Sequence, residues 1–161
     1  DALPISPVVY QQDDATVQAL KRLIPEWFSP VRARWHYYSM ARKNFRGYLQ
    51  GEQVRLKKYF YVLRPLLAVR WVEAGKGAPP MRFAELLAGS CLEAGLRQEI
   101  DELLARKQRA GEAEYGPRRP LLHAFIQSEL LRGAIPPALP DSRTGNIREL
   151  DRLLMTTVMG K

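Results

Sequence analysis

Apolar residues recur along this chain at spacings of three and four positions, whereas the alternation typical of β-strands is nearly absent. A spacing of three to four matches the period of an α-helix. The pattern predicts helices over residues 13–23, 30–50, 53–74, 82–88, 92–109, 120–131 and 146–159. We therefore predict an all-α fold, a helical bundle of about six to seven helices joined by short connections.

Proline, glycine and capping residues indicate where these helices begin and end. An aspartate pair at 13–14 is a suitable N-cap for the first helix, which we expect to end before Pro25. The Ser-Pro pair at 29–30 opens the second helix, and Gly51 stops it. Pro65 lies inside the third helix and is expected to kink it or to break it into two pieces.

The two longest predicted helices, 30–50 and 53–74, form a hairpin with an apolar stripe on each helix. On the first helix the stripe consists of Trp35, Tyr38, Ala41, Phe45 and Tyr48 or Leu49. On the second helix it consists of Leu56, Phe60, Leu63 and Leu67. We expect both stripes to pack into the core.

The length of the chain fits one domain. It has 161 residues, of which 46% are hydrophobic, enough to bury a core without disulfides or metals. We predict a single helical domain over 1–161, with its core at about 6–132. Residues 133–161 are predicted to form a Pro-rich connector plus a terminal helix, and residues 111–117 a loop.

Cysteine usage and hydropathy exclude several classes of protein. Cys91 is the only cysteine, so an intramolecular disulfide is excluded, and no Cys/His cluster has the spacing of a zinc site. No apolar run approaches the roughly 18 to 20 residues that a membrane span requires. We therefore expect a cytoplasmic protein with no membrane partner. The chain starts at Asp1 rather than at a methionine, and we interpret it as a fragment of a longer protein.

Positive charge is concentrated in the predicted hairpin. Between Arg32 and Arg70 the sequence has ten basic residues and one acidic residue, Glu52, so this segment carries +9 while the whole chain carries +8. A stretch of one sign repels itself and favours an anionic partner. The alternative interpretation is an ordinary solvated surface.

Side chains suited to phosphate form a row on the second helix of the hairpin. Lys57, Tyr61 and Arg64 are spaced i, i+4, i+7 and share one helix face. Arginine offers a fork of donors to phosphate, lysine adds a mobile charge, and tyrosine can stack on a base. Arg64 also lies beside Pro65, where a kink would open a pocket. Alternatively, the tyrosine is a half-buried packing residue.

Three segments of the chain resemble a known family. They are YYSMARKNFRGYL at 37–49, VRLKKYFYVLRPLLAVRWV at 54–72 and PPMRFAELL at 79–87. In these segments the sequence resembles the predicted nucleotidyltransferase family of the DNA polymerase β superfamily, and residues 56–67 are the most specific part. The resemblance extends from about Ser6 to Leu131 and corresponds to the C-terminal helical half of the family.

The resemblance implies a catalytic half that this chain does not contain. Family members are similar to other polymerase β-like enzymes in having an N-terminal α/β domain, in which a Gly-Ser turn and paired acidic residues hold two magnesium ions. Gly89 and Ser90 follow no predicted strand, and no Asp-x-Asp succeeds them. The resemblance therefore transfers no catalytic residue to this chain. Magnesium is expected only together with the missing catalytic domain.

For the residues that are present, the resemblance implies a substrate-side role. The residues that would bind a nucleoside triphosphate or an RNA are Lys43, Asn44, Lys57, Lys58, Tyr61 and Arg64. Additional candidates on the same hairpin are His36, Arg42 and Arg70. We thus expect the helical nucleotide- or nucleic-acid-binding portion of a nucleotidyltransferase, with its N-terminal catalytic domain as a partner.

Two other functions compete with this hypothesis. In the first, the hairpin is a protein-interaction module that docks on an acidic partner domain. In the second, Arg118 and His123 form the R-x4-H motif of an HEPN-like ribonuclease, although Pro120 lies between them and starts the predicted helix.

Overall fold

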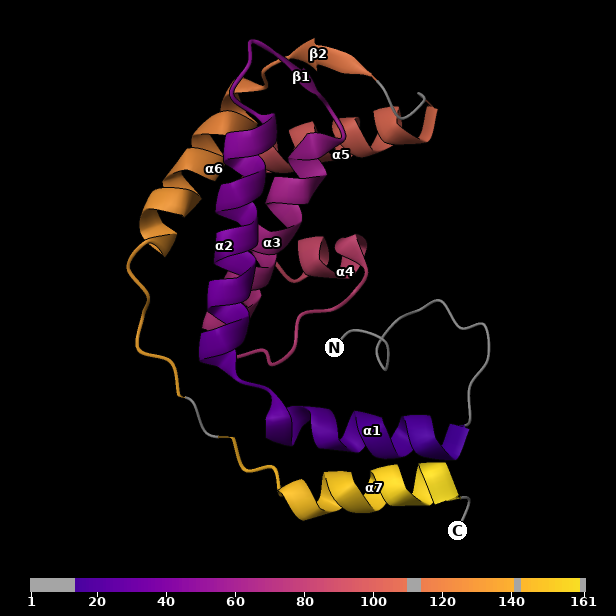
Figure 1. Cartoon of the computed structure of the whole chain (residues 1–161). Coiled ribbons are helices and arrows are strands. Elements are labelled where there is room, and N and C mark those ends of the chain that lie inside the picture. Colours follow the sequence, from indigo (N-terminus) through magenta and orange to yellow (C-terminus); the bar gives the residue numbers. More distant parts are fainter. Residues whose placement is uncertain (1–13, 110–113, 141–142, 160–161) are drawn as a thin grey trace.

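The computed structural model describes residues 14–109, 114–140 and 143–159 (Figure 1). Along these residues the elements are α1 (Asp14–Trp27), α2 (Pro30–Tyr48), β1 (Gln53–Arg55), α3 (Lys58–Glu73), α4 (Phe83–Ala88), α5 (Ala94–Arg109), β2 (Tyr115–Pro117), α6 (Pro120–Gly133) and α7 (Ile147–Met159). The fold is mostly helical, with one small two-stranded sheet, which confirms the predicted class.

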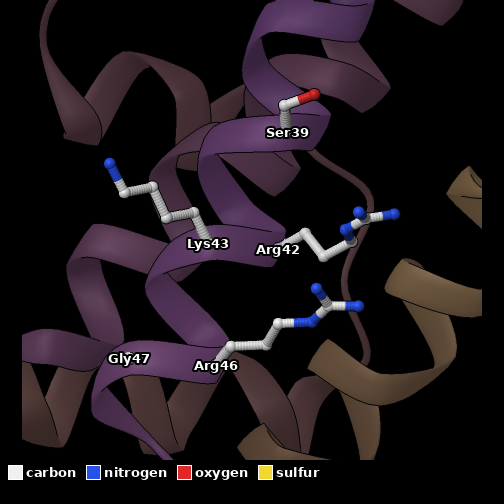
Figure 2. A pocket seen from close by; sticks show the side chains of 5 residues that line it. All are labelled: Ser39, Arg42, Lys43, Arg46 and Gly47. Atoms are coloured by element: carbon white, nitrogen blue, oxygen red, sulfur yellow. The ribbon is translucent and has the colours of Figure 1, made fainter.

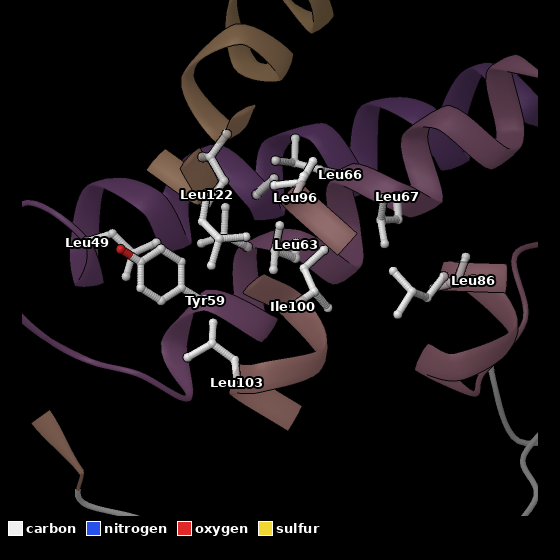
Figure 3. Packing of buried hydrophobic residues seen from close by; sticks show 14 of the residues in the cluster. Leu49, Tyr59, Leu63, Leu66, Leu67, Leu86, Leu96, Ile100, Leu103 and Leu122 are labelled. Atoms are coloured by element: carbon white, nitrogen blue, oxygen red, sulfur yellow. The ribbon is translucent and has the colours of Figure 1, made fainter. Parts of the chain in front are cut away.

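The α2–α3 hairpin is the centre of the fold. These two helices run side by side, α6 packs along both, α4 contacts α3, and α5 contacts α6 (Figure 1). Helix α3 is apolar around most of its circumference, as expected for a helix enclosed by others. Figure 3 shows side chains of α4, α5 and α6, together with Leu49, meeting around it. The largest buried apolar residues include Leu49, Tyr59, Leu63, Leu66, Leu67, Leu86, Leu87, Ile100, Leu103, Leu122 and Ile126.

The predicted start of α2 is confirmed by its N-cap, whereas the helix ends at Tyr48, two residues before its predicted end. The Ser29 hydroxyl accepts a hydrogen bond from the Arg32 backbone N–H at 3.3 Å, and Pro30 takes the first helical position, where a missing N–H costs nothing. At the other end, the backbone N–H of Leu49 donates to the carbonyl of Phe45 at 3.1 Å. The stripe assigned to the core is only partly correct, because Tyr38, Ala41 and Leu49 are buried whereas Trp35 and Tyr48 are exposed.

Proline does not end either of the helices that contain it. Helix α1 continues through Pro25 to Trp27, so its predicted end at residue 23 is wrong. Pro25 is exposed, so water can replace the hydrogen bond that it removes. Helix α3 likewise runs as one element past Pro65, and the expected break there is wrong. Asp13 lies outside the described residues.

The short antiparallel sheet was not expected from the sequence. Residues 53–55, predicted as helix, form β1, and residues 115–117 of the predicted loop form β2. Val54 pairs with Gly116, and both are buried. A Cβ at position 116 would come within 3.2 Å of the Leu56 side chain, so glycine allows this close approach. Strands of three residues are too short to produce a recognisable alternation.

Helices α1 and α7 lie side by side, across one end of the hairpin in Figure 1. The backbone N–H groups of Thr144 and Gly145 both donate to the Glu26 carbonyl at 3.1 Å, which fixes the chain entering α7 against the end of α1. Among the described helices, none combines the length and the apolar character that crossing a membrane would require.

Candidate functional site

The charge of the hairpin is divided between the interior and the surface. Arg34 is fully buried, and its Nε donates to Glu73 Oε1 at 3.0 Å while its Nη2 donates to the Gly133 carbonyl at 2.5 Å. The Arg70 guanidinium donates hydrogen bonds to both carboxylate oxygens of Glu129, each at 2.9 Å. Burial of a charge is tolerated when the charge is paired and hydrogen-bonded. Two cations of the basic segment therefore have a structural role.

Arg132 of α6 links these two ion pairs into one network. Its guanidinium contacts Glu73 at 2.5 Å and Glu129 at 2.9 Å. Burial alone would raise the pKa of Glu129, but the hydrogen bonds and positive charges of Arg70 and Arg132 outweigh this effect and hold the pKa below its ordinary range. The network ties α2, α3 and α6 together with ionised groups.

The predicted phosphate-binding residues of α3 also have contacts inside the fold. Arg64 is half-buried, and its Nη2 donates to the Met81 carbonyl. Lys58 places its ammonium over the rings of Tyr48 and Tyr61, 3.8 and 4.4 Å from their centroids. Such cation–π contacts hold the lysine against the protein surface. The predicted residue Lys57 is half-buried at the start of α3.

One face of α2 instead points into solvent and is entirely free of acidic residues. We call it the basic face of α2, defined by Ser39, Arg42, Lys43, Arg46 and Gly47. All five residues are exposed, and together they line an open hollow of about 410 Å³ (Figure 2). Within the described part of the chain, none of its three cations has an ion pair or a side-chain hydrogen bond.

The spacing of these residues explains the shape of the hollow. They follow i, i+3, i+4, i+7, i+8, which places them on one side of a helix, opposite the buried Ala41. Figure 2 shows Arg42 and Arg46 extending to the same side, while Lys43 diverges from them. Ser39 and Gly47 are small, so the space between the long side chains stays open. Like charges at i, i+4 repel each other, and a bound anion would relieve that repulsion.

The structure distributes the nine candidate residues over several places. Arg42 and Lys43 lie on the basic face of α2, and His36 is exposed on the same helix. The Asn44 side chain donates to the Tyr61 backbone carbonyl at 2.9 Å, so it faces α3. The other five candidates are Lys57, Lys58, Tyr61, Arg64 and Arg70.

Sequence reasoning did not single out Arg46 and Ser39. Arg46 was counted only as part of the basic segment, although it follows Arg42 by four residues. That spacing was the available signal, because it places two arginines on one helix face. Ser39 and Gly47 gave no chemical signal, since they contribute space rather than charge.

The described residues do not form a metal site. In the parts of the chain that the structure describes, no three His, Cys, Asp or Glu side chains gather closely enough to hold an ion. The two carboxylates nearest the hairpin interior, Glu73 and Glu129, are both bound by arginines. These residues therefore do not fit the two magnesium ions that the resemblance implies for its catalytic half.

Arg118 and His123 are both engaged in contacts within the fold. The Arg118 guanidinium donates to the carbonyls of Gln50 and Gly51, which fixes the start of β1. His123 Nδ1 lies 3.3 Å from the Tyr59 hydroxyl. Burial of the ring, together with the positive charge of Arg118, lowers the pKa of His123, while a hydrogen bond to the Leu49 backbone opposes the shift. These contacts give both residues a structural role.

Gly89 and Ser90 follow α4, a helix rather than a strand. The Ser90 hydroxyl donates to the Leu86 carbonyl at 2.7 Å, and a Cβ at position 89 would collide with the ring of Trp71. The glycine is therefore required by packing at this position, and the serine caps the end of α4.

Comparison with known proteins supports the resemblance seen in the sequence. The chain is 40% identical over 154 residues to the uncharacterized protein YcgL of Bacillus subtilis (strain 168), covering 95% of this chain and 59% of that protein. The chain thus spans about three fifths of the length of this relative. No solved structure matches the chain significantly. Residues 3–156 match the RlaP family, so the chain belongs to the RNA repair pathway DNA polymerase beta family.

Proposed function

We propose that this helical region binds the phosphate groups of RNA on the basic face of α2, as the nucleic-acid-binding portion of a polymerase β-like nucleotidyltransferase. The observation that supports the proposal most directly is the hollow itself. Three exposed cations surround about 410 Å³ of open space, and none has an ion pair within the described chain.

The phosphates of a nucleic-acid strand fit the cations of this surface. Arg42 and Arg46 can each grip two oxygens, and Lys43 adds a point charge at the edge of the hollow. Helix geometry places the two arginine Cα atoms about 6 Å apart along the axis, so one strand can contact both. Polyanion binding of this kind releases counterions and falls steeply with salt.

The family indicates the class of nucleic acid. Its description refers to an RNA repair pathway, so RNA is the polymer that we propose. Because the described residues lack a carboxylate cluster, we propose that this region binds RNA without reacting with it. Magnesium-dependent chemistry would require the remaining part of a longer family member.

The test is binding of a labelled single-stranded RNA of about 12 nucleotides, followed by fluorescence anisotropy across about 50 to 200 mM salt. Arg42→Ala/Arg46→Ala should weaken binding at least tenfold at the lowest salt and reduce the slope of log K against log salt by about 1.4. The matched control is Arg97→Ala/Arg106→Ala, which removes the same charge from α5. An equal loss of RNA affinity in both double variants, or no RNA binding by the unaltered chain, would contradict the proposal.

Polyglutamate of equal charge separates phosphate recognition from docking on an acidic protein. A guanidinium fork pairs with carboxylate and phosphate alike, so charge and fork geometry act equally on both polymers. A higher affinity for the RNA would therefore show recognition of the nucleic acid beyond charge. Equal affinity for both polymers would favour the protein-docking alternative. A nucleoside triphosphate added as competitor then shows whether a single nucleotide occupies the hollow or whether several phosphates are needed.

A further inference from the structure

Trp35 is an exposed aromatic residue on the same side of α2 as the two arginines of the basic face. Its exposed fraction is 41%, which contradicts its predicted place in the core stripe. Trp35, Ser39, Arg42 and Arg46 follow i, i+4, i+7, i+11, so they form one row along the helix. The row extends about 16 Å along the axis, from the indole to the second arginine.

Trp35 contacts two neighbouring side chains and is still partly exposed. The guanidinium carbon of Arg34 lies 4.9 Å from the centroid of the indole, and Arg34 itself is fully buried. Arg34 therefore covers the inner face of the ring. The Tyr38 ring packs beside the indole and stands nearly perpendicular to it, at 78° and 5.8 Å between centroids. Despite these two contacts, 41% of the Trp35 surface stays exposed to solvent, which leaves surface that a flat ligand can cover.

The indole is also held in place by the interior of the fold. Arg34 is fixed beneath it by Glu73 and by the Gly133 carbonyl. The Tyr38 hydroxyl donates to the Leu130 carbonyl at 3.0 Å, which fixes the tyrosine ring beside the indole. A ring that is already oriented loses little conformational entropy when a flat ligand covers it. This is the arrangement expected of a stacking platform rather than of a mobile surface residue.

We propose that Trp35 stacks on an unpaired nucleobase of the RNA whose phosphates lie on the basic face of α2. The proposal rests on the function proposed above and narrows its substrate to single-stranded RNA. A base within a duplex is already stacked on both sides and cannot cover the indole. An unpaired base can cover the indole. The phosphates that follow this base would then lie along the row toward Arg42 and Arg46.

The experiment measures the affinity of the whole chain for three probes of equal strand length. They are an oligoadenylate of about eight nucleotides, an abasic oligomer without bases, and a duplex of the same strand length. Trp35→Ala should bind the oligoadenylate about 5-fold to 150-fold more weakly, the range found when one stacked base loses its aromatic partner. Its affinity for the abasic oligomer and for the duplex should remain unchanged.

Two further variants keep the test decisive if the alanine variant is unstable. Trp35→Phe retains a ring and should keep most of the preference for the oligoadenylate over the abasic oligomer. Tyr48→Ala removes an aromatic residue of similar exposure from the face of α2 that packs toward α3, and it should behave like the unaltered chain. Thermal unfolding of each variant shows that the fold is intact.

The outcomes distinguish this inference from the proposed function. If the unaltered chain binds the oligoadenylate and the abasic oligomer equally, or if the preference for bases survives in Trp35→Ala, the stacking role is wrong and phosphate binding stands. If neither probe binds, the proposed function itself is wrong. If the preference for the oligoadenylate over the abasic oligomer disappears only in Trp35→Ala, the result supports both the proposed RNA binding and the stacking role of Trp35.

Discussion

The Asn44 side chain donates a hydrogen bond to the backbone carbonyl of Tyr61 at 2.9 Å, across the α2–α3 hairpin. In a regular helix this carbonyl accepts from the N–H four residues later. Here that position is Pro65, which has no N–H. The amide of one helix therefore replaces the hydrogen bond that proline removes from the other. This relationship explains why α3 continues past Pro65 as one element.

The replacement predicts a coupling between positions 44 and 65. Asn44→Ala should lower the free energy of unfolding by about 0.5–1.5 kcal/mol, because the Tyr61 carbonyl loses its protein donor at a site that water can reach. In a Pro65→Ala background the same change should cost clearly less, since an alanine at this position restores the helical N–H donor. Urea unfolding of the four proteins in this double-mutant cycle measures the interaction term.

Gln50 provides the matched control for this cycle. Its side-chain amide also donates to a backbone carbonyl, that of Phe45, at 3.0 Å and at an exposed position. Proline is not involved there, so Gln50→Ala should cost the same with and without Pro65. An Asn44→Ala cost that is equal in both backgrounds would show that the amide does not compensate for the proline.

The helical elements were predictable because their signals are local. The Ser29–Pro30 pair lies next to the helix that it starts, and apolar periodicity was sufficient to identify α2 through α6 to within a few residues, apart from the start of α3. The pairing of Val54 with Gly116 was not predictable, since it joins positions about 60 residues apart through strands of three residues. Only the tertiary structure brings these segments together.

The ion pairs of the basic residues in the hairpin were likewise not predictable from the sequence. Sequence reasoning predicted an anion-binding hairpin, but it could not say which cations are already neutralised. The partners of Arg34 and Arg70 are Glu73 and Glu129, both outside the basic segment. Because the pairing depends on how α2, α3 and α6 pack, the sequence pattern showed an excess of charge and not its position. The solvent-facing remainder became visible only in the fold.

The ionised carboxylate of Glu129 should make stability depend on acid pH. Its pKa is held below the ordinary glutamate value of about 4.3 by Arg70 and Arg132, so its contribution to stability is present above that value and is lost as the pH falls through the lower, folded-state pKa. Glu129→Gln should cost about 2 kcal/mol at neutral pH. This is less than the about 3–5 kcal/mol of a fully buried pair because both arginines are partly exposed.

Urea unfolding at neutral and acid pH measures this effect. The difference between Glu129→Gln and the unaltered chain should shrink as the pH falls, because the unaltered carboxylate then becomes neutral as well. Glu85→Gln is the control, since Glu85 is exposed and its contact with Arg82 is long, at 3.9 Å. A difference that stays constant with pH would mean that Glu129 does not carry the charge of the network.

His123 should make stability depend on pH in a higher range. The unfolded chain takes up a proton near the ordinary histidine pKa of about 6.5, whereas burial and Arg118 keep the folded pKa lower. Stability should therefore fall as the pH decreases from about 7 toward about 5, because the unfolded state binds more protons in that range. His123→Gln should reduce this dependence, while His36→Gln controls for the general effect of removing a histidine. An unchanged slope in His123→Gln would contradict the assignment.

Two helical glycines should respond in opposite directions to the same substitution. At Gly133 of α6 an added Cβ would lie 2.8 Å from the Tyr38 ring, closer than carbon atoms approach without displacement. The Gly133 carbonyl also accepts from buried Arg34, so the backbone cannot shift freely. Gly133→Ala should therefore destabilise the protein by about 1–3 kcal/mol through overpacking.

Gly47 of α2 provides the comparison, because nothing lies within 4 Å of the Cβ that alanine would add there. Gly47→Ala should stabilise the protein by about 0.5–1 kcal/mol, since alanine restricts the unfolded chain and favours helix. Thermal and urea unfolding of both variants measure whether each substitution raises or lowers the free energy of unfolding. Destabilisation by Gly47→Ala would mean that the solvent-facing side of α2 is packed against something, and the basic face could then not be open to RNA.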